Sequence, residues 1–196
     1  MYTILMTVLF ALVPSNLELA EDALLLAVQD LPADLSSYGA NEVLIEIEGD
    51  HSGSWLIKQT ISAVLHENGI TVYERNELSD SLMMTLRVRP MELVVEYGDV
   101  SRPWIIGNKR VERIAKCELS STLLDTDGTI LMTVRTSGVN DDVISWSDAE
   151  VLAGSSDWDW LTGDLPENTG GGILEPIIVS GVVASLVYLF YSSRAQ

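Results

Sequence analysis

The sequence predicts an α/β (α+β) fold: one domain whose mixed sheet starts with a β-α-β unit and continues as an antiparallel meander, plus a C-terminal transmembrane helix. Three observations support this prediction. Strand-like, helical and again strand-like periodicities follow one another between residues 42 and 73. Alternating apolar positions then recur in segments separated by turn signals. Finally, Pro176 to Ser193 contains no charged residue, and a helix of this length spans roughly 27 Å, close to the hydrocarbon thickness of a bilayer.

The ends of the chain predict an envelope protein. Ile4 to Pro14 is an apolar run of a length typical of signal peptides, so we expect a signal peptide over residues 1–15. An uncleaved anchor is the alternative, since no Lys or Arg precedes this run. With a transmembrane helix over 173–193, the body of the protein is expected on the periplasmic, extracytoplasmic side of the membrane. The C-terminus is then cytoplasmic, in agreement with Arg194 as the only charged residue after the span.

The net charge of −18 is concentrated in the flanks of the chain. Nine acidic and no basic residues precede Lys58, and nine acidic and no basic residues lie between Arg135 and Arg194. Acidic flanks repel nucleic acid, so we expect no nucleic-acid partner. The sequence contains no glycine-rich nucleotide loop and no Cys/His ligand cluster, so no cofactor is expected.

Residues 16–37 predict an amphipathic helix, because their apolar side chains recur at helical spacing. Asn16 is the expected N-cap, and the acidic residues of the first turn suit the helix dipole. Pro32 is expected to break or kink this helix, because it lacks a backbone N–H and clashes with the preceding turn.

A β-α-β unit follows. Glu42 to Glu48 alternates apolar and acidic residues, which is typical of a strand. Trp55 to Asn68 carries one apolar stripe and predicts a helix, with Ser52 or Ser54 as its N-cap and Gly69 just after its end. A short strand comes next. A crossover helix between two strands predicts that the strands are parallel.

The next part predicts two strands, one on either side of Pro90. Alternate residues are apolar in Leu82 to Val88 and again in Met91 to Tyr97, so each segment is expected to turn one face to the core. Met91 is expected on the same face as Leu93, Val95 and Tyr97. Gly98 to Asn108 predicts a long loop or hairpin tip.

A long hairpin is expected after this loop. Val111 to Leu124 predicts a strand, Asp127-Gly128 is the strongest hairpin signal in the chain, and Thr129 to Thr136 predicts the return strand. The inward-facing side chains of the first of these strands are expected to be Ala115, Cys117, Leu119, Ser121 and Leu123.

The remainder of the chain completes the domain and leaves it. Val143 to Leu152 predicts a final strand running into a short helix. The extracytoplasmic α/β domain is therefore expected over residues 42–153. Residues 154–172 are acidic and glycine-rich, and they predict a tether to the span.

Few residues suggest catalytic chemistry. Asp50-His51-Ser52 places a carboxylate, a base and a hydroxyl side by side, so a membrane-anchored hydrolase with a site near Asp50 and His51 is one alternative function. Neighbouring residues rarely point at a common atom, however, which favours a loop that caps the following helix. No catalytic residue is assigned, and we expect a protein that is not an enzyme.

A cation-binding surface protein is the second alternative. Asp125-Thr126-Asp127-Gly128 resembles the start of a calcium loop but lacks the later ligands and the closing Glu, which favours a hairpin turn. Asp157, Asp159 and Asp164 could bind a cation weakly, although a solvated tether is the favoured interpretation. No metal ligand is assigned.

The basic cluster of the sequence is expected to form ion pairs. Glu112 and Glu118 interleave with its four residues, which favours pairs across neighbouring strands. Docking of the acidic tail or of an acidic partner is the alternative. The cluster consists of Lys109, Arg110, Arg113 and Lys116.

The predicted interaction residues are aromatic and apolar side chains in the loop and in the tether. We expect a protein partner in the envelope, because side chains of this kind are enriched in interfaces. Packing of the same side chains on the domain or at the membrane interface is the alternative. The residues are Trp104, Ile105 and Ile106 in the loop, and Trp158 and Trp160 in the tether.

The predicted span carries two small-xxx-small pairs, Gly181 with Ser185 and Ser180 with Ala184. Such pairs allow two helices to pack closely in a membrane. A homo-oligomer is therefore a second kind of partnership that the sequence leaves open, besides contact with the membrane itself.

Two short motifs resemble those of a known family. ITVYERNEL (Ile70 to Leu78), with Glu74 and Arg75, and LLDTDGTILMT (Leu123 to Thr133) resemble the curli-secretion CsgG and TolB amino-terminal group of bacterial envelope domains. The resemblance covers residues 42–137 and implies an extracytoplasmic, non-enzymatic assembly or interaction module. The chain departs from this group because a C-terminal span stands in place of the lipoprotein cysteine.

Overall fold

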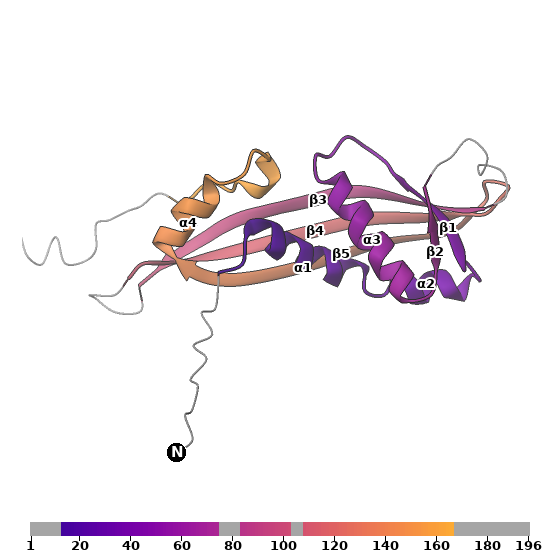
Figure 1. Ribbon diagram of the computed structural model, residues 1–196, viewed down its shortest axis with the longest axis horizontal. Coiled ribbons are helices and arrows are strands. Elements are labelled where there is room, and N and C mark those ends of the chain that lie inside the picture. Colours follow the sequence, from indigo (N-terminus) through magenta and orange to yellow (C-terminus); the bar gives the residue numbers. More distant parts are fainter. Residues whose placement is uncertain (1–12, 75–82, 103–107, 167–196) are drawn as a thin grey trace, which may run out of the picture. The chain divides into compact units, whose positions relative to one another are not determined.

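The computed structural model describes residues 13–74, 83–102 and 108–166. Within them, five strands form one mixed sheet in the order β2-β1-β3-β4-β5 (Figure 1). Strand β1 pairs parallel with β2 and β3, whereas β3, β4 and β5 are antiparallel neighbours. The predicted mixed sheet, with its β-α-β start and antiparallel meander, is therefore confirmed. The strands are β1 Glu42–Ile47, β2 Thr71–Tyr73, β3 Met84–Ser101, β4 Arg110–Leu124 and β5 Ile130–Ser145.

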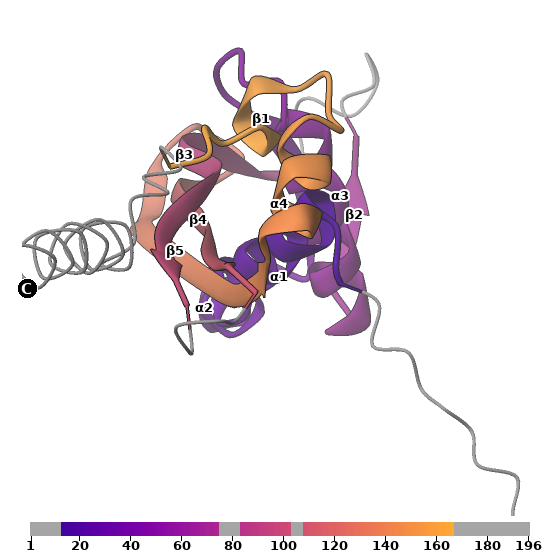
Figure 2. The ribbon, with the colours of Figure 1, turned by 90° about the vertical axis from the view of Figure 1, so that its left-hand side faces the viewer.

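Two long helices cover one face of the sheet. Helix α1 packs on β4 and β5, and α3, which connects β1 to β2, packs beside α1. Seen along its strands, the sheet curves around these helices (Figure 2). The helices are α1 Asn16–Val28, α2 Leu31–Ser37, α3 Ser54–Glu67, α4 Trp146–Ala153 and the 3-10 helix η1 Asp159–Leu161.

The core lies between the sheet and helices α1 and α3. In β4, the odd-numbered residues from Val111 to Leu123 are buried, and the even-numbered residues between them are only partly buried. This alternation confirms the inward positions predicted for the strand. They include Cys117, which is 1% exposed. Burial of these apolar side chains is the main force that holds the helices on the sheet.

The N-terminal helix differs from the prediction at its cap. Ser15, not Asn16, is the N-cap of α1: its Oγ accepts a hydrogen bond from the Glu18 N–H at 3.1 Å, and the Glu18 carboxylate accepts one from the Ser15 N–H at 2.6 Å. This reciprocal pair is a capping box. The predicted break is confirmed, because α2 starts at Leu31 with Pro32 in its first turn, where a helix does not use the missing N–H.

Helix α3 also starts differently from the prediction. Its N-cap is Gly53 without any side-chain cap, so neither Ser52 nor Ser54 has that role. A Cβ at position 53 would lie 2.7 Å from Leu93 Cδ2, so glycine fits where this loop approaches the sheet. At the other end Gly69 follows the helix with a φ of +79°, in the left-handed conformation predicted for it.

Strand β3 runs through Pro90 instead of ending there. Its register against β4 shifts by one residue between Pro90 and Glu92, so Met91 is the extra residue of a bulge. Buried side chains occupy even positions before the bulge, such as Val88, and odd positions after it, such as Leu93. The prediction that Met91 shares a face with Leu93 is therefore wrong, since Met91 is 50% exposed and Leu93 is 3% exposed.

Two strands extend beyond their predicted ends. Strand β3 continues to Ser101, inside the predicted loop 98–108, and β5 continues to Ser145 instead of ending at Thr136. The strand-then-helix segment predicted for 143–152 corresponds to the end of β5 and to α4. Long antiparallel pairing with β4 keeps β5 extended where its own sequence is not strongly strand-like.

Two glycines have clear roles along the β4–β5 hairpin. Gly128 has a φ of +84° in the turn between the strands, which confirms the Asp127-Gly128 hairpin. Gly138 lies in the middle of β5, where a Cβ would be only 2.0 Å from the Ala23 carbonyl oxygen of α1. Gly138 thus allows the helix backbone to lie directly on the strand.

The part of the chain that the structure describes contains no helix long and apolar enough to cross a bilayer. The predicted transmembrane helix, residues 173–193, lies entirely outside the described ranges, as do residues 1–12 of the predicted signal peptide. Trp104, Ile105 and Ile106 are outside them as well.

Candidate interaction surface

Four aromatic rings from two distant parts of the chain lie in a row on the domain. Trp55 of α3 contacts Trp158, with ring centroids 5.3 Å apart and planes tilted by 47°. Trp158 stacks on Trp160, with centroids 6.1 Å apart and planes at 14°. Trp160 in turn contacts His51, in the loop before α3, at 6.0 Å between centroids. We call these four residues the aromatic row.

The aromatic row is buried at Trp160 and accessible at Trp55 and Trp158. Trp160 is 6% exposed and belongs, with Leu161, to the main core. Trp55 and Trp158 are each 40% exposed. The first part of the predicted tether therefore packs on the domain, and Trp160 shows the packing that the sequence offered as the alternative to partner binding. Trp158 keeps an accessible ring.

His51 is held by its own loop. Its Nδ1 accepts a hydrogen bond from the Gly53 N–H at 2.9 Å, and its carbonyl oxygen accepts one from the Ser54 N–H at 2.9 Å. Both the His51 ring and its backbone are therefore used inside this loop. His51 thus shapes the start of α3, which is the interpretation that the sequence favours over a catalytic role.

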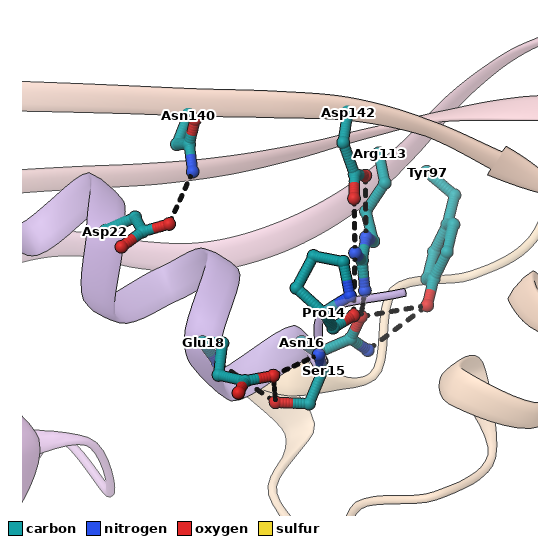
Figure 3. A network of polar contacts seen from close by, with 9 residues as sticks. All are labelled: Pro14, Ser15, Asn16, Glu18, Asp22, Tyr97, Arg113, Asn140 and Asp142. Atoms are coloured by element: carbon teal, nitrogen blue, oxygen red, sulfur yellow. Dashed lines mark hydrogen bonds and ion pairs between the residues drawn. The ribbon is translucent and has the colours of Figure 1, made fainter. Parts of the chain in front are cut away.

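Figure 3 shows a buried polar network that joins strands β3, β4 and β5 to the start of α1. Arg113 of β4 is 0% exposed. Its Nε and Nη2 donate to the two carboxylate oxygens of Asp142 at 3.0 and 2.6 Å, a bidentate pair. Its Nη1 donates to Asn16 Oδ1 at 2.7 Å, and its Nη2 also donates to the Pro14 carbonyl at 2.9 Å.

Asn16 extends this network to the C-terminal segment. Its Nδ2 donates to the Leu161 carbonyl at 2.6 Å and to the Leu152 carbonyl at 3.2 Å. The Tyr97 hydroxyl donates to Asn16 Oδ1 at 3.2 Å. Because Leu161 directly follows Trp160, these bonds hold the buried part of the aromatic row. The residues before α1 and those after α4 are therefore fastened at one point of the sheet.

Burial affects the chemistry of this network. It raises the pKa of the Tyr97 hydroxyl, an effect that the hydrogen bond with Asn16 and the charge of Arg113 partly oppose. Tyr97 therefore stays neutral and can donate to Asn16. Removing one partner of a buried ion pair leaves an uncompensated charge and costs about 3–5 kcal/mol. The network is thus suited to positioning the chain, not to exchanging protons.

The predicted basic cluster is divided between two faces of the sheet. Lys116 pairs with Glu96 across β3 and β4, which confirms a cross-strand ion pair. Arg113 also pairs across strands, but on the buried face, and this burial was missed. The sequence contained a signal of this burial, because Arg113 is odd-numbered, like the inward-facing residues of the same strand. Lys109 lies over the Trp146 ring, 5.4 Å from its centroid.

The described ranges contain no group of three or more His, Cys, Asp or Glu side chains placed to hold a metal ion. The carboxylates of Asp125 and Asp127 accept hydrogen bonds from the N–H groups of Thr126 and Thr129, at 2.7 and 2.9 Å, within the hairpin turn. Burial raises the pKa of the Cys117 thiol to about 12, so it remains protonated and a weak nucleophile.

Comparisons with known proteins identify no family for this chain. No family model matches the sequence, and no curated protein is similar to it. One similar solved structure is a minor lipoprotein from Acinetobacter baumannii, with 13% identity, a TM-score of 0.35, and coverage of 53% of this chain and 70% of that one. Another is described as a neuraminyllactose-binding hemagglutinin homolog from Helicobacter pylori, with 14% identity, a TM-score of 0.35, and coverage of 55% and 68%. Likenesses at this TM-score carry no weight for fold or function.

Proposed function

We propose that this protein is a single-span component of the cell envelope whose α/β domain is a non-enzymatic interaction or assembly module. Its partner is another protein, and the contact surface is the accessible part of the aromatic row, Trp55 and Trp158. The observation that carries this proposal is the contact between two tryptophan rings, each 40% exposed, one of which stacks on the buried Trp160.

Two features suit this surface to binding. Tryptophan is enriched in protein interfaces and especially among the residues that contribute most to affinity. Trp158 is also restrained before any partner arrives, because Trp160 packs beneath it and Leu161 is hydrogen-bonded to Asn16. A restrained side chain loses little conformational entropy on binding. The surface therefore combines a large apolar area with a low entropic cost.

Two polar atoms beside this surface support the proposal further. Ser54 Oγ and Trp160 Nε1 are buried without a hydrogen-bond partner in the described part of the protein. An unpaired buried donor costs about 1–3 kcal/mol, so it is expected where another requirement outweighs stability.

The envelope location rests on the sequence. The apolar run at the N-terminus and the uncharged segment 176–193 suit an extracytoplasmic domain on a single C-terminal span. The resemblance to the CsgG and TolB amino-terminal group implies the same compartment and a role in assembly. The partner is accordingly sought among envelope proteins.

A photo-crosslinking amino acid at position 59 tests the proposed surface. Gln59 is exposed on α3 four residues after Trp55, so its side chain lies on the same side of the helix. In cells that make the protein, we expect one discrete adduct with another protein. The matched control is Ala33, an exposed helical position on α2. Absence of an adduct at 59, or the same adduct at 33, would refute the proposed contact.

A further inference from the structure

Within the described ranges, strand β5 forms an edge of the sheet over its whole length. Among the described residues no strand pairs with its outer side, and the strand runs for 16 residues. It contains neither proline nor lysine, and its register irregularity lies next to the hairpin, opposite Leu124. Proteins usually protect long edges with such residues, with bulges or with short strands. Strand β5 is therefore open to pairing with another strand.

Helix α1 exposes apolar side chains beside the middle of this edge. At Gly138, where α1 lies against β5, a Cβ would be 3.0 Å from the Cβ of Leu26. Leu26 is 45% exposed and its neighbour Leu25 is 40% exposed. A groove of about 560 Å³ is lined in part by both leucines and by Asn140 of β5. An uncovered apolar helix surface thus lies next to an unpaired strand edge.

Two opposite charges lie at equal distances from Gly138 along β5. Arg135 is three residues before it and Asp141 three residues after it, and both alternate with the core-facing residues, so they lie on the sheet face opposite α1. The Arg135 Nε donates to Glu118 of β4, whereas no hydrogen bond or ion pair joins the Asp141 carboxylate to another described residue. When a second β5 strand runs in the opposite direction and is centred on the same glycine, Arg135 of each strand therefore lies opposite Asp141 of the other.

We propose that a second copy of this chain pairs antiparallel with β5 about a two-fold axis at Gly138. In this register each Arg135 lies opposite the Asp141 of the other copy, so the pair forms twice. The two α1 helices then lie on the same face of one continuous sheet. Helix α1 packs on β4 and β5, so the two helices lie next to each other across the axis. Leu25 and Leu26 are covered where the helices meet.

Charge reversal tests this dimer. Sedimentation velocity on the purified full chain is expected to show a dimer. Arg135→Asp and Asp141→Arg should each weaken it about tenfold or more, because like charges then lie opposite each other at two places. Combining the two substitutions rebuilds both pairs with reversed sign, so the double variant should dimerise like the parent protein.

Two further variants separate pairing from folding. Arg135→Asp also removes the intrachain pair with Glu118, so Val139→Lys provides an independent test: Val139 is 55% exposed on the same face, one residue from the axis. It should weaken the dimer several-fold, because the two new ammonium groups lie diagonally across the axis from each other and from Arg135 of the other copy, and it should leave the circular dichroism spectrum unchanged. Arg89→Asp, at an exposed arginine of β3, is the control and should leave the dimer intact.

The outcomes are decisive in both directions. A parent protein that is monomeric at every concentration overturns the proposal. A dimer that survives the three single substitutions in β5 also overturns it and places the contact elsewhere, for example in the predicted span. A double variant as weak as the single ones overturns the register centred on Gly138.

Discussion

The Nη1 group of Arg113 donates a hydrogen bond to Asn16 Oδ1 at 2.7 Å, between strand β4 and the start of α1. Asp142 holds the guanidinium from the other side, and Asn16 donates to the Leu161 carbonyl. One buried cation therefore connects the first helix of the domain to the segment that carries Trp158. A partly satisfied buried network is costly, so the loss of any member should be measurable.

Replacing Arg113 with methionine should destabilise the domain strongly. Arg113→Met leaves the Asp142 carboxylate and Asn16 without their buried donor, and we expect a loss of about 3–5 kcal/mol in the free energy of unfolding. Urea denaturation measures this quantity. The control is Arg87→Met, which removes an exposed pair with Glu46 and should cost at most about 1 kcal/mol. Equal losses in both variants would contradict a special role for Arg113.

Replacing Asn16 with alanine should loosen the C-terminal segment selectively. Asn16→Ala removes the donor to the Leu161 and Leu152 carbonyls, so backbone amides near residues 158–162 should exchange with deuterium faster than in the parent protein. Ser15→Ala is the control, since it removes the N-cap of α1 at a cost of about 1 kcal/mol without touching this segment. If both variants changed exchange at 158–162 equally, Asn16 would not be the link.

A methyl group at position 138 should push α1 away from β5. In Gly138→Ala the new Cβ would lie 2.0 Å from the Ala23 carbonyl oxygen, so the helix must shift, at a cost of about 1–3 kcal/mol or more. Gly154→Ala is the matched substitution, because the nearest atom to its Cβ is 3.8 Å away. Thermal or urea unfolding compares them, and a Gly138→Ala variant as stable as Gly154→Ala would be inconsistent with this packing.

The stability of the domain should fall at alkaline pH partly because of Cys117. Its ordinary thiol pKa of 9.0 is raised to about 12 by burial, so the unfolded state releases its proton first. The stability linked to this thiol is complete below about pH 9 and is lost as the pH rises towards 12. Denaturation of the parent and of Cys117→Ala at several alkaline pH values should show a steeper decline for the parent. Parallel declines would show that the thiol does not contribute.

Much of the fold could be predicted because local patterns agreed with the tertiary structure. The odd-numbered inward positions of β4, the Asp127-Gly128 turn and the β-α-β order all follow from periodicity and turn chemistry. Prediction failed at Pro90, because a proline inside a strand signals a break unless a bulge accommodates it. The bulge could have been inferred from the sequence, because the apolar positions are even-numbered before Pro90 and odd-numbered after it.

The candidate site was only partly predictable, because its residues come from separate segments. Trp158 was identified from sequence, but nothing in a local pattern brings Trp55 of α3 next to it. Arg113 could have been recognised, since a charged residue in an otherwise apolar stripe requires a buried partner. Its partners Asn16 and Asp142 lie 97 and 29 residues away and became apparent only through the register of the sheet.

The proposed role of the aromatic row is tested most directly by repeating the crosslinking from position 59 in a Trp158→Ala background. Trp158 is 40% exposed, so its replacement should leave the domain folded. Val151→Ala, at an exposed apolar position of α4, serves as the control. We expect the adduct with the partner protein to disappear in Trp158→Ala and to persist in Val151→Ala. An adduct of unchanged yield in Trp158→Ala would contradict the proposed interaction surface.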